Sequence, residues 1–179
     1  MGFVFKTGIG AAALVGALAF GTSAHALTSF TVGLEAKCTA GKLKTDGKGV
    51  AAYTGCWSKA QAKALALDPI CLGKASTKTT GAFGKLDLKP PCYVSGDGPA
   101  RDTDAANYAS GVAATVGVST LATGKCDSAK TKLVGKYVAG VAGCFAKAAA
   151  KAPGLVDNAI GGCVDKNATK LLAGVTKAE

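Results

Sequence analysis

Residues 37–56 read KCTAGKLKTDGKGVAAYTGC and residues 125–144 read KCDSAKTKLVGKYVAGVAGC, so one cysteine spacing occurs twice in the chain. An ungapped alignment of residues 37–63 with residues 125–151 matches 14 of 27 positions. Biased composition alone would give roughly two or three matches. A second match, offset by 92 residues, relates Cys71 to Cys163 and Lys85 to Lys177. The sequence therefore predicts an internal duplication.

Each unit is predicted to be an antiparallel helical hairpin. Alanine and lysine, which are good helix formers, fill the segments between the cysteines. Eighteen residues make about five turns, so Cys38 and Cys56 share one face but lie about 27 Å apart along the helix. They cannot bond to each other at that distance. The returning helix is expected to start with Asp68 as its N-cap and Pro69 in its first turn.

The cysteines of the returning helix are the expected disulfide partners. The spacing favours a nested pattern in which Cys56 pairs with Cys71 near the turn and Cys38 pairs with Cys92 at the open end. By correspondence, Cys144 pairs with Cys163. The counterpart of Cys92 would fall at position 184, past the last residue, so Cys126 is expected to be a free or intermolecular thiol. Seven cysteines permit other connectivities, which stay open.

The segment between the units is predicted to be a linking helix from about residue 104 to 122, capped by Asp102 or Thr103. Its apolar residues recur at helical spacing and are expected to face the hairpins: Ala105, Tyr108, Val112 and Val116. Its valines and threonines also fit a strand. The expected fold is all-α, a small bundle of two disulfide-stapled antiparallel hairpins joined by this helix. The expected units are residues 1–26, a signal peptide; 27–92, the first hairpin; 93–123, the loop and linking helix; and 124–179, the second, shorter hairpin.

The N-terminus is typical of a secretory signal peptide. Lys6 precedes an apolar run at residues 9–20, and Ala24 and Ala26 form an A-x-A cleavage sequence. An uncleaved anchor is the alternative, but the run is shorter than the roughly 20 residues that a spanning helix needs. After processing we expect no stable transmembrane segment. Export together with scattered cysteines indicates a secreted or periplasmic protein with disulfides.

Several classes of chemistry are disfavoured after such processing. The only histidine, His25, leaves with the signal peptide, and no C-x-x-C occurs. A Ser-His or Cys-His nucleophile, a histidine-ligated metal and covalent haem attachment then lack their residues. Asp97, Asp102 and Asp104 match no calcium loop and fit turn and cap positions better. We therefore expect no enzyme activity, no metal and no cofactor.

Lysine is the most regularly patterned polar residue. Residues 27–179 contain 20 Lys and Arg against 11 Asp and Glu, and all but one of the 20 are lysine. Two sets of three fall within roughly 60° of each other on a helical wheel, and they are candidate contacts for a polyanion: Lys44, Lys48 and Lys59, then Lys132, Lys136 and Lys147. A solvated face would hold the same lysines without any ligand. Nucleic acid is disfavoured because arginine is nearly absent and no aromatic residues interleave with these lysines.

The cysteine spacing, Lys42 and the turn sequence DPICLGKA resemble those of uncharacterised exported bacterial proteins built from repeated Cys/Lys/Ala-rich helical hairpins. The resemblance covers about residues 35–92 and 123–178 and implies no catalytic residue. The first functional expectation is a non-enzymatic structural or binding role. The alternatives are a cationic effector that binds anionic cell-envelope polymers or membranes, and a carrier of a small apolar ligand. A further possible partner is a second copy of the chain, bound through Cys126.

Overall fold

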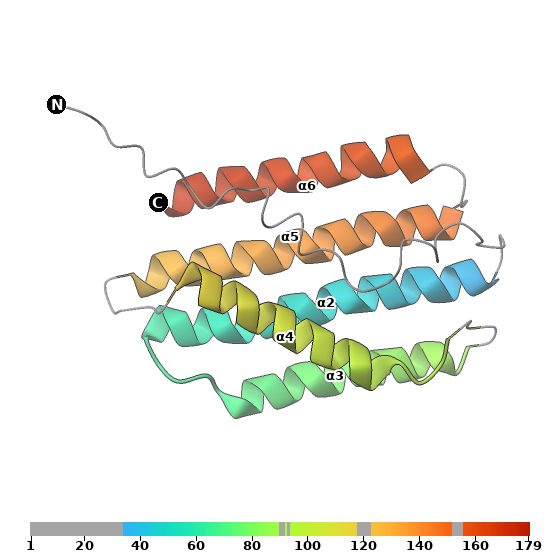
Figure 1. The fold of residues 1–179 in the computed structure, drawn as a ribbon, viewed down its shortest axis with the longest axis horizontal. Helices are drawn as coiled ribbons and strands as arrows, with labels where there is room; N and C mark the ends of the chain where they lie inside the picture. Colours follow the sequence, from blue (N-terminus) through green and yellow to red (C-terminus); the bar gives the residue numbers. More distant parts are fainter. Residues whose placement is uncertain (1–33, 90–91, 93, 118–122, 152–155) are drawn as a thin grey trace.

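The computed structural model describes residues 34–89, 92, 94–117, 123–151 and 156–179, with the backbone alone for 156–160. The predicted signal peptide, residues 1–26, lies outside this part. The described residues form five helices and no strand, which confirms the all-α class (Figure 1). The helices are α2 (Leu34–Lys63), α3 (Pro69–Asp87), α4 (Gly98–Val116), α5 (Gly124–Lys151) and α6 (Val156–Ala178).

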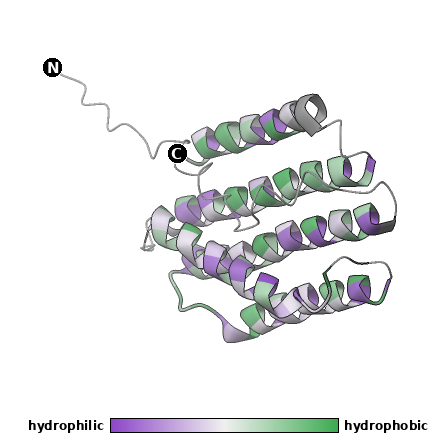
Figure 2. Ribbon diagram, turned by 45° about the vertical axis from the view of Figure 1, so that its right-hand side comes forward, coloured by the Kyte–Doolittle hydropathy of each residue, from purple (hydrophilic) through white to green (hydrophobic). Residues whose placement is uncertain are grey.

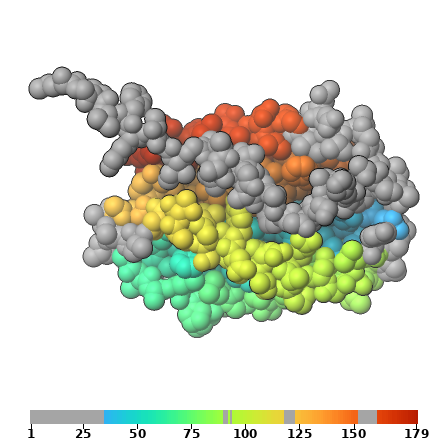
Figure 3. Space-filling model, viewed as in Figure 1, coloured from blue at the N-terminus to red at the C-terminus, as the bar shows by residue number. Residues whose placement is uncertain are grey.

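Four of the helices form one layer, in the order α3, α2, α5, α6 (Figure 1). Helices α2 and α3 form the first antiparallel hairpin, and α5 and α6 form the second. Helix α4 lies across one side of this layer, where it contacts α2, α3 and α5 (Figures 1 and 3). Among the described helices, α6 contacts α5 alone. The two hairpins are therefore neighbours in one layer, with the linking helix on one side of it.

Three disulfides join the helices in the predicted nested pattern. Cys38 pairs with Cys92 at a Cα–Cα distance of 5.5 Å, and Cys56 pairs with Cys71 at 5.8 Å. In the second hairpin Cys144 pairs with Cys163, also at 5.8 Å. Cys126 is free and half-buried. The three bonds indicate an oxidising environment, such as the periplasm or the extracellular space.

Small residues let α2 and α5 pack directly against each other, a contact that the sequence did not predict. A Cβ added to Gly47 would lie 2.6 Å from the Ala142 Cβ, and one added to Gly135 would lie 1.9 Å from the Thr54 Oγ1. Neither position has room for a side chain. Because Gly47 precedes Thr54 on α2 while Gly135 precedes Ala142 on α5, the two helices run antiparallel.

The core lies between four helices: α2, α3, α4 and α5. Its buried residues come from all four of these helices: Val50, Tyr53, Ala75, Ala105, Ala109, Val112, Val134, Tyr137, Val138 and Val141. Helix α6 adds partly buried side chains at its border: Val164, Ala168 and Leu171. In Figure 2 the hydrophobic positions recur between hydrophilic ones along the long helices, as expected for elements with one side in a core.

The linking helix differs from its predicted position. It begins at Gly98, with Asp97 at the N-cap and Pro99 in the first turn, rather than near residue 104. Proline fits the first turn because its missing N–H has no partner there in any case. Asp102, a predicted cap, is instead buried inside the helix. The strand alternative is wrong for residues 98–116.

Other local predictions are confirmed. The Asp68 carboxylate accepts a hydrogen bond from the backbone N–H of Ile70, as expected of an N-cap. In α4, Ala105 and Val112 are buried and face the hairpins. Tyr108 and Val116 are partly buried against the same core.

Helix α5 is long and apolar enough to cross a membrane, judged by length and composition alone. Core helices of soluble proteins pass the same test. Here Val134, Val138 and Val141 of this helix are buried against α2 and α4. The finding therefore does not establish a membrane span.

We predict that Gly47→Ala destabilises the fold by about 1–3 kcal/mol, because the new Cβ would overlap Ala142 and lie 3.0 Å from the backbone Cα of Ala139. Gly55→Ala, in the same helix, is the control. A Cβ at Gly55 would meet nothing within 4 Å, so alanine is expected to stabilise the helix by about 0.5–1 kcal/mol. Urea unfolding with the disulfides intact measures both changes. Equal effects of the two substitutions would contradict close packing at Gly47.

Candidate functional site

The three candidate lysines of α2 lie on the side of the helix that meets no other described helix. Successive residues of an α-helix are turned by about 100° around its axis, so each neighbour of α2 has its own side. Gly47 faces α5, and Cys56 faces α3 through its disulfide. Tyr53 faces α4, where its hydroxyl donates to Asp102. The remaining side, opposite α4, carries the three candidate lysines, all exposed: Lys44, Lys48 and Lys59.

Helix α5 has the same arrangement. Gly135 faces α2, and Cys144 faces α6 through its disulfide. Val138 lies in the core that α5 shares with α4. The side away from all three contacts again carries exposed lysines: Lys132, Lys136 and Lys147.

Both sets point to the same side of the layer, because each lies opposite the core on which α4 packs. Gly55 and Gly143 lie among them, and a Cβ at either position would meet nothing within 4 Å. This is expected of an open surface. No ion pair among the described residues involves these six lysines, which we call the central lysine rows. Figures 1 and 3 view the molecule from the α4 side, opposite these rows.

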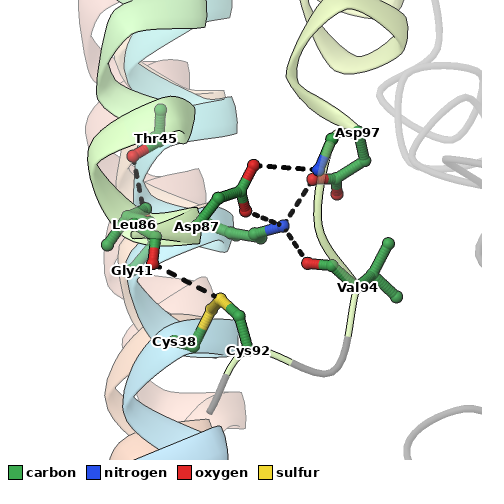
Figure 4. Close-up of a disulfide and its surroundings, with 10 residues drawn as sticks. Cys38, Gly41, Thr45, Leu86, Asp87, Cys92, Val94 and Asp97 are labelled. Atoms are coloured by element: carbon green, nitrogen blue, oxygen red, sulfur yellow. Dashed lines mark hydrogen bonds and ion pairs between the residues drawn. A yellow bond between two sulfur atoms is a disulfide. The ribbon is translucent and has the colours of Figure 1, made fainter. Parts of the chain in front are cut away.

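Lys42 of α2 behaves differently from its neighbours because it is buried. Its ammonium group forms ion pairs with Asp87, at 2.8 Å, and with Asp97. It also donates to the backbone carbonyl of Val94 and lies 5.8 Å from the centre of the Phe83 ring. Figure 4 shows this cluster beside the Cys38–Cys92 disulfide, where Asp87, Asp97 and Val94 converge. The cluster therefore holds the segment after α3 against α2.

The pKa directions agree with this geometry. Burial alone would lower the pKa of Lys42, but its hydrogen bonds to Asp87 and Asp97 outweigh burial and raise it. The hydrogen bond from Lys42, followed by that from the backbone N–H of Gly96, lowers the pKa of Asp87. Both groups thus remain charged over a wider pH range than usual.

Asp46 lies nearby on the α4-facing side of α2 and has an unusual pKa. Burial raises the pKa of this carboxyl to about 6. The positive charges of Arg101 and Lys42 oppose the shift, while the carboxylates of Asp97 and Asp104 add to it. Asp46 is therefore a group that titrates just below neutral pH.

Asp102 joins three helices. Its two carboxylate oxygens accept hydrogen bonds from the Tyr53 hydroxyl of α2, at 2.8 Å, and from the Ser76 hydroxyl of α3, at 2.6 Å. Burial, followed by the bond to Asp102, raises the pKa of Tyr53. Among the described residues no group of His, Cys, Asp or Glu is arranged to hold a metal ion. The arrangement at Asp102 is structural.

Cys126 lies in the first turn of α5, close to Lys130. Lys130 donates to the Glu179 carboxylate at 3.3 Å, and this bond raises the pKa of Lys130. Lys130 is 88 residues after Lys42, and Glu179 is 92 residues after Asp87. The same ion pair thus recurs at the two predicted offsets.

Sequence reasoning assigned no role in the fold to Lys42 or Asp46, and it placed Asp102 wrongly at a helix cap. Lys42 and Lys130 were visible as matched lysines, and their acidic partners match at the second offset. That joint recurrence was a signal for an ion pair within each hairpin. Asp46 and Asp102 carry no comparable signal, because their burial depends on where α4 lies.

We predict that Lys42→Met destabilises the protein by about 2 kcal/mol, because it leaves Asp87 and Asp97 partly buried without their cation. Lys44→Met, on the exposed side of the same helix, should change stability by no more than about 0.5 kcal/mol. Urea unfolding at neutral pH measures both. A loss of stability in the Lys44 variant as large as that in the Lys42 variant would contradict the assigned difference.

We predict that Asp46→Asn stabilises the protein at pH 7.5 but not at pH 4. A carboxyl with a raised pKa in the folded state favours folding below the unfolded pKa, near 4, and loses that contribution as the pH rises through about 6. Asparagine has no charge to bury, so the expected gain at pH 7.5 is about 1–2 kcal/mol after allowing for partial exposure. Unfolding curves of both proteins between pH 4 and 8 test this; parallel pH profiles would show that Asp46 is not perturbed.

Comparisons with protein-family models, with curated proteins and with solved structures found no match to this chain. The most regular surface feature of the described helices is the pair of central lysine rows.

Proposed function

We propose that this chain is an exported, disulfide-stabilised protein with a non-enzymatic binding role, and that its central lysine rows bind anionic polymers or membranes of the cell envelope. The observation that carries the proposal is the placement of six exposed lysines on one side of two adjacent helices. Such a concentration of like charge attracts a polyanion, and the attraction becomes stronger as the salt concentration is lowered.

Export is supported by two independent features. The N-terminal sequence has the basic start, apolar run and A-x-A ending of a signal peptide. The three disulfides require an oxidising compartment to form and persist. The periplasm or the cell exterior is therefore the proposed location.

The non-enzymatic role is supported by composition. His25, the only histidine, lies within the predicted signal peptide. The Asp87 carboxylate is engaged in an ion pair with Lys42 of the neighbouring helix, and burial accounts for the raised pKa of Asp46. We find no pair of groups among the described residues that is placed for acid–base or nucleophilic chemistry.

Two earlier expectations stay predictions. Self-association through Cys126, a half-buried free thiol, would appear as a doubled mass without reductant. Among the described residues, no observation favours a carrier of a small apolar ligand.

The test compares two triple variants that remove the same charge. We expect Lys44→Gln, Lys48→Gln and Lys136→Gln together to lower the salt concentration at which the protein elutes from immobilised heparin. Heparin serves in this test as a linear polyanion. The control, Lys89→Gln, Arg101→Gln and Lys130→Gln, removes three cations outside the rows and should elute near the unmodified protein. Equal shifts for the two variants would mean that net charge alone controls binding, which would refute the proposal.

A further inference from the structure

The side of the layer opposite α4 carries lysines from α3 as well as from α2. Cys71 and Ala75 of α3 face α2 and the core. Ser76 faces α4 through its bond to Asp102. At 100° per residue, roughly the opposite side from Ser76 carries three exposed lysines: Lys74, Lys78 and Lys85.

Helix α6 extends the same surface at the other edge. Its Cys163 and Asn167 face α5, where Asn167 lies against Gly140. Val164 and Leu171 border the core. The side away from the core again carries exposed lysines: Lys166, Lys170 and Lys177.

Lys37 and Lys125 are exposed two turns before Lys44 and Lys132, on the same sides of α2 and α5, so the four helices together place fourteen exposed lysines on one side of the layer. We call this set the lysine face: Lys37, Lys44, Lys48, Lys59, Lys74, Lys78, Lys85, Lys125, Lys132, Lys136, Lys147, Lys166, Lys170 and Lys177. Residues 34–179 contain 20 Lys and Arg and 11 Asp and Glu. Six cations and eleven acids therefore remain for the rest of this part of the chain.

The acidic residues that the structure describes on these helices lie elsewhere. Asp46 lies on the α4-facing side of α2, where the charge of Arg101 of α4 influences its pKa, and Asp87 shares the Lys42 ammonium group with Asp97, the N-cap of α4. Asp97 and Asp104 belong to the α4 side itself, where both pair with Arg101. One side of the layer is thus strongly positive, and Asp46, Asp87, Asp97 and Asp104 lie on the α4 side. Such a charge distribution orients the molecule near a negatively charged surface.

The shape of the lysine face selects among anionic partners. Packed helices lie about 8–10 Å apart, so four neighbouring helices give four lysine rows spread over about 30 Å. A linear polymer that follows one or two rows leaves the others unused. A planar anionic surface contacts all four rows at once.

The residue types of the lysine face also determine whether its side chains would insert into an anionic surface or stay on top of it. Lysine is a strongly hydrated point charge on a flexible stem, and Gly55 and Gly143 within the rows add no side chain to this surface. The large aromatic Trp57 packs against the core instead. No aromatic residue of the described helices lies on this face, so it lacks the aromatic side chains that anchor proteins at the level of the lipid headgroups.

We propose that the lysine face lies flat on the anionic headgroup surface of a lipid bilayer, with α4 directed away from it. This inference rests on the proposed function and names the partner as a bilayer surface rather than a linear polymer. Electrostatic attraction of basic residues to such a surface is worth about fivefold in partitioning per lysine. Outer and central rows should therefore contribute equally.

The experiment measures partitioning of the oxidised, exported protein onto vesicles of equal parts phosphatidylglycerol and phosphatidylcholine, by sedimentation, at several salt concentrations. Vesicles of phosphatidylcholine alone are the lipid control. The outer variant combines Lys74→Gln, Lys78→Gln and Lys170→Gln. The central variant, Lys44→Gln, Lys48→Gln and Lys136→Gln, and the control variant, Lys89→Gln, Arg101→Gln and Lys130→Gln, complete a set in which each protein loses three positive charges. Urea unfolding verifies that all are folded.

We expect the outer and central variants to lose about 100-fold in partitioning at low salt, and the control variant to lose less than about fivefold. Unmodified protein should leave the vesicles as salt rises and should not bind phosphatidylcholine alone. The proposal of a bilayer partner would be overturned if the outer variant bound as well as the unmodified protein, or if the unmodified protein did not bind the anionic vesicles. If heparin elution still separates the central from the control variant, the proposed function stands and the partner is a linear polymer.

Discussion

The close antiparallel contact of α2 with α5 fixes where every other side of these helices is directed. At Gly47 and Gly135 the neighbouring helix occupies the space that a Cβ would need, so the two helices meet along a line of small residues. The disulfides then bring α3 and α6 to the outer sides, and the core with α4 takes a third side. Only one side of α2 and one side of α5 remain exposed to water. The lysines occupy that side because every other side is already in contact.

Lysine serves two different purposes in this chain. Lys42 and Lys130 lie on the inner sides of their hairpins, and each is paired with an acid near the end of the returning helix. The first pair is buried and sits beside a disulfide, so it stabilises the open end of its hairpin. The second is more exposed and contributes little, since surface pairs are worth roughly 0–1 kcal/mol. The lysines of the face have no such partner among the described residues, and their charge is available for something outside the protein.

How much the sequence predicts depends on the range of the interaction. The nested disulfides follow from matched distances along two helices, and the Asp68 cap follows from a local preference, so both were predictable. The start of α4 was placed too late because Gly98 and Pro99 are typical of loops, although proline also fits a first helical turn. The buried role of Asp102 and the α2–α5 contact involve residues far apart in sequence, and neither has a local signature. The lysines of α3 and α6 match each other in the repeat alignment. That they face the same side as the lysines of α2 and α5 follows only from the arrangement of the four helices in one layer.

The symmetry relation between the two hairpins explains why lysines at equivalent positions of the repeat form one continuous surface. Gly47 faces Ala142, and Gly135, 88 residues after Gly47, faces Thr54, 88 residues before Ala142. Contacts that exchange in this way are those of a two-fold axis perpendicular to the layer. Rotation about such an axis turns one hairpin onto the other and leaves each side of the layer unchanged. Lysines at equivalent positions therefore fall on the same side, whereas two hairpins stacked face to face would have turned their rows in opposite directions. Helix α4 has no counterpart among the described helices and lies on one side alone, which leaves the lysine side open across both hairpins.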